Sequence, residues 1–77
     1  MDFADFKSHV RKAHEKEKSV SALTDYPMMR KGQIAWNELY EVRPDICRLI
    51  MAGAREIDPF VDDSRLPAFY EFVEENW

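Results

Sequence analysis

The sequence is poor in the residues that build several common kinds of functional site. It has one cysteine, Cys47, so no internal disulfide can form. Its two glycines, Gly32 and Gly53, are too few and too isolated for a glycine-rich phosphate loop. The apolar runs are too short to span a bilayer, and no signal-peptide-like apolar segment follows the N-terminus. We therefore expect a soluble cytoplasmic protein with no membrane partner.

Motifs for metal binding and catalysis are also missing. The sequence has no Cys-x-x-Cys and no His-Glu-x-x-His motif, and the five-residue spacing of His9 and His14 places them on different faces of a helix. We predict two surface histidines, no metal and no cofactor. Cys47 lies in an apolar stretch without a neighbouring histidine, which is typical of a buried structural thiol. With only 77 residues to form a water-excluding pocket, we predict no catalytic residues and no enzymatic activity.

What the sequence does contain is helical periodicity. Hydrophobic residues make up 45% of the chain, and no stretch alternates with the period of a β-strand. We predict a single all-α domain of three to four helices. Residues 1–18 are expected to form a basic N-terminal helix, residues 19–27 a linker, and residues 28–77 a helical core. Val20 and Leu23 of the linker are expected to pack against that core.

Local signals divide the core further. Asp25 and Pro27 are suited to the start of a helix that begins properly after Lys31, and Pro44 can end this helix and begin the next. The next helix is expected to bury Ile46, Leu49 and Ile50 and to end at a left-handed Gly53. A loop anchored by Ile57, Phe60 and Val61 and a last helix over residues 65–76 are predicted to follow.

Charge divides the chain into two unlike parts. Residues 1–31 carry a formal charge of +2 and residues 32–77 a charge of −6. An acidic surface can bind a partner protein, although a merely solvated acidic surface has the same composition. The predicted partner-binding face consists of Glu38, Glu41, Asp62, Asp63, Glu71, Glu74 and Glu75.

Nucleic-acid binding is the alternative function. The basic residues of the first helix, together with a proline-marked turn between later helices, are compatible with a small DNA-binding regulator. Neighbouring Glu15 and Glu17 dilute this basic surface. The candidate contacts to nucleic acid are Lys7, Arg11, Lys12, Lys16 and Lys18.

A longer pattern suggests a biological context. The stretch RKGQIAWNELYEVRPDI, followed by DPFVDDSRLPAFYEFV, resembles small bacteriophage- and prophage-encoded proteins that have no assigned activity. The matching positions are Arg30, Gly32, Gln33, Asn37, Pro44, Asp58, Pro59, Phe60, Asp62, Asp63, Arg65 and Phe69. The resemblance implies a non-enzymatic accessory protein in the host cytoplasm that binds and modulates a host protein complex, with inhibition of a defence complex as one form of this activity.

The same region carries a structural hypothesis. Gln33 and Asn37 are one helical turn apart and therefore share a helix face. We expect their side-chain amides to hydrogen-bond to the aspartate-rich loop and so fix the loop against the second helix. The oligomeric state of the protein is left open by the sequence.

Overall fold

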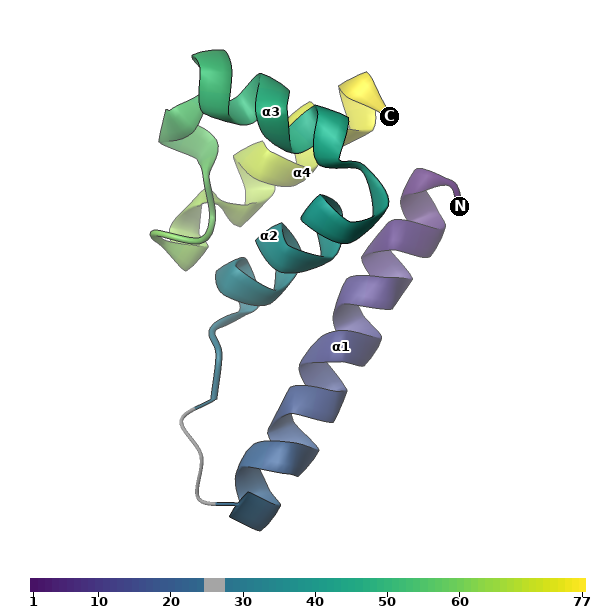
Figure 1. The fold of residues 1–77 in the computed structure, drawn as a ribbon, viewed down its shortest axis with the longest axis vertical. Helices are drawn as coiled ribbons and strands as arrows, with labels where there is room; N and C mark the ends of the chain where they lie inside the picture. The colour runs from purple at the N-terminus through teal and green to yellow at the C-terminus, as the bar shows by residue number, and fades with distance from the viewer. Residues whose placement is uncertain (25–27) are drawn as a thin grey trace.

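Four α-helices and two short 3-10 helices make up the fold in the computed structural model, which describes residues 1–24 and 28–77 (Figure 1). In chain order they are α1 (Phe3–Thr24), α2 (Lys31–Val42), α3 (Pro44–Gly53), η1 (Arg55–Ile57), η2 (Asp63–Arg65) and α4 (Leu66–Asn76). No β-strand occurs in these two described segments, and the predicted all-α domain is confirmed with four α-helices. Asp25 and Pro27, which the sequence places at a helix start, lie outside the described residues.

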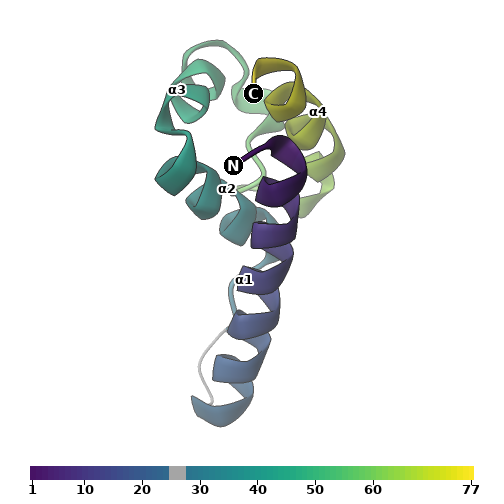
Figure 2. The same cartoon turned by 90° about the vertical axis from the view of Figure 1, so that its right-hand side faces the viewer.

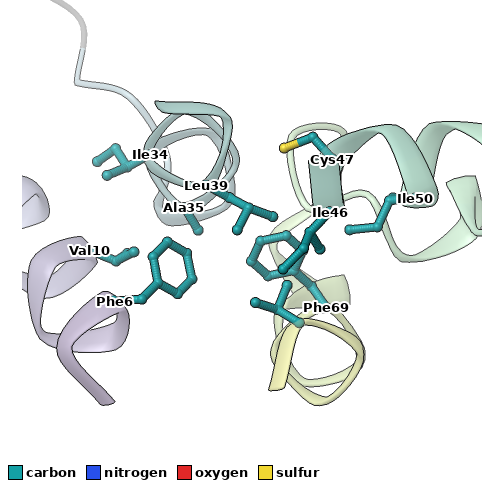
Figure 3. Packing of buried hydrophobic residues seen from close by; sticks show 10 residues of the cluster. Phe6, Val10, Ile34, Ala35, Leu39, Ile46, Cys47, Ile50 and Phe69 are labelled. Carbon is teal, nitrogen blue, oxygen red and sulfur yellow. The ribbon is translucent and has the colours of Figure 1, made fainter. Parts of the chain in front are cut away.

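Helix α2 is the centre of the fold. It packs against α1 on one flank and against α3 on the other, and η2 lies near its first turn. In Figure 3, Leu39 of α2 lies between Phe6 of α1 and Phe69 of α4. All three side chains are fully buried, so each stabilises the fold by roughly 2 kcal/mol relative to an exposed position.

Helix α1 is longer than predicted. Its regular turns continue to Thr24, so residues 19–24 are helical and do not form a linker. The distal half extends past the other helices (Figures 1 and 2). Val20 and Leu23, expected to pack against the core, are instead 42% and 86% exposed. Both residues lie in the last two turns of α1, which extend past the other helices that the structure describes.

Helix α3 begins as predicted and buries Ile46, Ile50 and Cys47 as predicted, whereas the prediction for Leu49 is wrong. Pro44 occupies the first turn of α3, directly after the end of α2. The buried stripe consists of Ile46, Cys47 and Ile50, whereas Leu49 is 50% exposed. Relative to Ile46, Cys47 is displaced by about 100° around the helix in the same direction as Ile50. Leu49 is displaced from Ile46 in the other direction.

The end of α3 also differs from the prediction. Gly53 is the last residue of the helix and does not have a left-handed backbone conformation. The following Ala54 ends the helix with φ −140°, and its N–H donates to the carbonyl of Ile50 at 2.8 Å. The helix therefore ends without the glycine-dependent left-handed cap.

The loop after η1 is buried at Pro59, whereas the two large apolar side chains that follow it are exposed. Phe60 and Val61, predicted as core anchors, are 41% and 65% exposed. Pro59 is fully buried, and Ile57 is partly buried against the core, as predicted. The chain turns immediately after Pro59, which directs the next two side chains to the surface.

The aspartate-rich loop is fixed to the start of α2, but by other residues than the sequence suggested. Arg30 donates from Nη1 to Asp63 Oδ1 at 3.0 Å and from Nη2 to the Phe60 carbonyl at 2.6 Å. The backbone N–H of Gly32 donates to the same Asp63 oxygen at 3.0 Å. We call these three contacts, made by residues about 30 positions apart in the chain, the loop latch.

The two amides predicted to hold this loop act locally. Gln33 Oε1 accepts a hydrogen bond from the N–H of Arg30 at 2.9 Å, which caps the start of α2. Asn37 Nδ2 approaches the sulfur of Met29 at 3.8 Å. The hypothesis that these two amides bind the loop is therefore wrong, because helix rotation directs them to the segment preceding α2.

Trp77 joins the first and last helices. Its ring stacks on Phe6, with ring centroids 5.4 Å apart, and its Nε1 donates to the carbonyl of Met1 at 3.1 Å. Arg43, between α2 and α3, donates to the Trp77 carbonyl at 2.5 Å and lies over the indole ring. Arg43 also forms two hydrogen bonds with Asp45, which lower the pKa of that carboxyl.

Candidate functional site

Three glutamates from two elements gather on one side of α4. Glu71 and Glu75 are four residues apart on α4, so they project from the same face. The 3-10 helix η1 packs against α4 and adds Glu56. We call Glu56, Glu71 and Glu75 the acidic patch.

The acidic patch surrounds an apolar hollow. The hollow has a volume of about 350 Å³, and its apolar lining comes from Ala54, Ile57, Ala68 and Phe72. Ile57 and Phe72 are only partly covered by the core. A partly exposed apolar centre with charged residues around it is the usual organisation of a protein-binding surface.

The carboxylates of the acidic patch are not neutralised by neighbours. Among the described residues, none of the three takes part in an ion pair. Like charges at positions i and i+4 destabilise a helix by roughly 0.2–0.5 kcal/mol. Glu71 and Glu75 therefore have a small cost for stability, which no ion pair among the described residues offsets.

The remaining members of the predicted acidic face are distributed over the molecule. Glu74 is exposed on α4, whereas Glu38 contacts His9 Nε2 at 2.7 Å. Glu41 borders a hollow beside Lys12 and Lys16 of α1. These carboxylates do not line the hollow of the acidic patch.

The two aspartates of the predicted face have local structural roles. Asp63 belongs to the loop latch. Asp62 accepts a hydrogen bond from the N–H of Ser64 at 2.9 Å, which caps η2 and lowers the pKa of the Asp62 carboxyl. The acidic face predicted from the sequence included Asp62 and Asp63 and omitted Glu56. The position of all three residues relative to α4 depends on how the loop folds back.

The five predicted basic residues fall on two sides of α1. Lys7, Arg11 and Lys18 lie within about 40° of one another around the helix, and we call them the first basic row. Lys12 and Lys16 lie on the far side of the apolar stripe, where they face Glu38 and Glu41.

The first basic row lies next to α4 and the start of α2. Lys7 Nζ is 5.3 Å from the ring centroid of Tyr70 and 5.9 Å from that of Phe3. Arg11 and Lys18 border a pocket to which α2 contributes Lys31. Lys31 was not among the predicted contacts, because nothing in the sequence indicates that α2 begins beside the middle of α1.

The cysteine and the two histidines differ in exposure. Cys47 is fully buried, and burial raises the pKa of its thiol to about 12. His9 is surface-exposed as predicted, but His14 is only 9% exposed, so the prediction of two surface histidines is wrong for His14. His14 follows Val10 by one helical turn at the edge of the buried stripe, which accounts for its burial.

Metal binding, membrane insertion and similarity to known proteins bear directly on function. Residues 1–24 and 28–77 contain no group of three histidine, cysteine or acidic side chains that could hold a metal ion. None of the helices in this part of the chain has the length and apolar character that crossing a bilayer requires. Comparison with protein-family models, curated protein sequences and solved structures gives no match.

Proposed function

We propose that this protein is a non-enzymatic interaction protein that binds a partner protein through the acidic patch. The observation that carries the proposal is the combination of three unpaired carboxylates with a partly exposed apolar hollow. A partner that presents lysine or arginine side chains around an apolar residue is complementary to this surface in charge and in polarity.

The energetic balance of α4 supports the same proposal. Glu71 and Glu75 repel each other, and Glu75 lies in the last turn of α4, where the helix dipole disfavours negative charge. Replacing either carboxylate by a cation would remove this cost. A surface that is locally unfavourable for folding is more readily explained by binding than by stability.

The partner class follows from the resemblance to bacteriophage and prophage proteins. We extend the proposal to a host protein complex in the bacterial cytoplasm, which this protein would bind stoichiometrically and modulate, for example by inhibiting a defence complex. Such a target would lose its own ligand if the acidic patch occupied a surface that normally binds phosphates.

Affinity capture with matched charge reversals tests the proposal. Wild-type protein, the double variant Glu71→Lys/Glu75→Lys and the control Glu41→Lys are tagged and exposed to nuclease-treated bacterial lysate. A partner of the acidic patch is retained by wild type and by the control and is lost with the double variant. Calorimetry with the purified partner then measures how affinity changes with salt.

A different distribution of captured proteins would contradict the proposal. If the double variant retains the same proteins as wild type, the acidic patch is not the binding surface. Because Glu41 belongs to the acidic face that the sequence predicted, loss of binding with Glu41→Lys alone would move the contact to the α1–α2 side.

Nucleic-acid binding remains the second candidate, and one observation favours it. Arg11, Lys18 and Lys31 border one pocket, and Lys7 lies 5.3 Å from the ring centroid of Tyr70 in the same pocket, so these four cations lie on one side of the molecule. Four phosphate contacts would give a salt dependence of log K on log salt with a slope of about −3.6 for duplex DNA. Fluorescence anisotropy with labelled DNA measures this slope, and a slope near zero would exclude the candidate.

A further inference from the structure

A second pocket, separate from the acidic patch, lies where α1 meets the starts of α2 and α4. Its volume is about 410 Å³, which is within the range of roughly 300–1,000 Å³ typical of small-molecule sites. Val10, Leu66 and Tyr70 give it an apolar lining. Burial raises the pKa of the Tyr70 phenol, so this side chain stays neutral at physiological pH.

His14 makes the pocket chemically specific. The residue is only 9% exposed and lines the pocket. Within residues 1–24 and 28–77 it forms no hydrogen bond or ion pair, and no buried side-chain nitrogen or oxygen of the described chain lacks a partner. The free ring nitrogens of His14 are therefore accessible from the pocket, where an imidazole N–H can donate to a ligand.

Positive charge surrounds this histidine. Arg11 and Lys18 of α1 and Lys31 of α2 border the pocket, and Glu15 is the one acidic residue in its lining. Glu15 is 3.9 Å from Lys18, and both side chains are more than half exposed. The Coulomb attraction of this pair is therefore weak, and the pocket retains an excess of positive charge.

We propose that this pocket binds a small amphipathic anion, in which a phosphate or carboxylate group is joined to a flat apolar body. The oxyanion would lie among Arg11, Lys18 and Lys31 and accept a hydrogen bond from His14. The apolar body would pack on Leu66 and Tyr70. This proposal is independent of the partner-binding function, because the acidic patch and the pocket share no residue.

A titration followed by NMR tests the proposal with defined probes. Phenyl phosphate and benzoate are added separately to isotope-labelled protein, with inorganic phosphate and phenol as probes that lack one half of the ligand. We expect the two amphipathic anions to shift signals of His14 and Tyr70 and to bind about tenfold more tightly than inorganic phosphate or phenol. The ratio of the phenyl phosphate and benzoate affinities distinguishes a phosphate site from a carboxylate site.

Charge and donor variants complete the test. His14→Phe keeps a ring of similar size but removes the donor, and Lys31→Glu changes an exposed residue without altering the core; each should weaken binding about tenfold or more. Lys16→Glu makes the same charge change on the other side of α1 and should leave binding within about twofold. Equal affinity for all four probes, or equal weakening by Lys31→Glu and Lys16→Glu, would show unspecific ion binding and overturn the proposal.

Discussion

The close packing of Gly32 against the loop leads to a specific prediction for the variant Gly32→Ala. A Cβ atom at this position would lie 2.0 Å from the Pro59 carbonyl oxygen and 2.7 Å from Asp63 Oδ1. Both are much shorter than a normal van der Waals contact, and the nearer atom belongs to the backbone of a buried residue. We expect Gly32→Ala to push the loop away from the start of α2.

The magnitude follows from the contacts that must break. Displacing the loop strains a packed site, which costs roughly 1–3 kcal/mol. It also weakens the part-buried hydrogen bond from Gly32 to Asp63, which contributes roughly 1.5–3 kcal/mol, and the exposed ion pair from Arg30 to the same carboxylate, which contributes at most about 1 kcal/mol. The intrinsic helix preference of alanine over glycine returns at most about 1 kcal/mol. A net loss of about 3 kcal/mol is therefore expected.

Gly53→Ala is the matched control. Gly53 is also helical, but nothing lies within 4 Å of the Cβ that alanine would add there. Its backbone is compatible with alanine, so this variant should gain about 0.5 kcal/mol from reduced entropy of the unfolded chain. The same substitution is thus predicted to have opposite signs at the two glycines.

Urea unfolding followed by circular dichroism at 222 nm measures both effects. A domain of this size has a total stability of roughly 5–10 kcal/mol, so a loss of 3 kcal/mol moves the unfolding midpoint clearly. If Gly32→Ala proves as stable as wild type, the loop does not pack on α2 as described and the latch is refuted. A loss in both variants would indicate a general effect of substituting glycine in these helices.

Three further predictions concern the core, reactivity and pH. Phe6→Ala should cost roughly 3–5 kcal/mol in urea unfolding, whereas Leu23→Ala should change stability by less than about 0.5 kcal/mol because its side chain is largely exposed. The thiol of Cys47, buried and with its pKa raised to about 12, should react with a disulfide reagent at pH 8 only as fast as the chain unfolds. The N–H of Ser64 holds the pKa of Asp62 below its ordinary 3.8, so this contribution to stability is present above pH 4 and is lost as pH falls through the lower folded value. Asp62→Asn should reduce the difference in melting temperature between pH 5 and pH 3, and an unchanged difference would count against the cap.

The helical class, the break between α2 and α3 and most of the buried face of α3 can be inferred from the sequence alone. These features depend on residue spacing within one element and on the fixed backbone angle of Pro44, so they can be inferred locally. The same local reasoning separates exposed Glu71 and Glu75 from buried Phe69 and Val73 on α4.

Which residues make up each site depends on the tertiary structure. Glu56 joins the acidic patch, and Lys31 joins Arg11 around His14, because packing brings separate helices together at a particular rotation and offset. Periodicity gives the buried face of each helix to within a few tens of degrees, and it does not specify which neighbour covers that face. The exposed end of α1 and the contact between Arg30 and Asp63 have the same physical origin. Both depend on how separate segments of the chain are placed relative to one another.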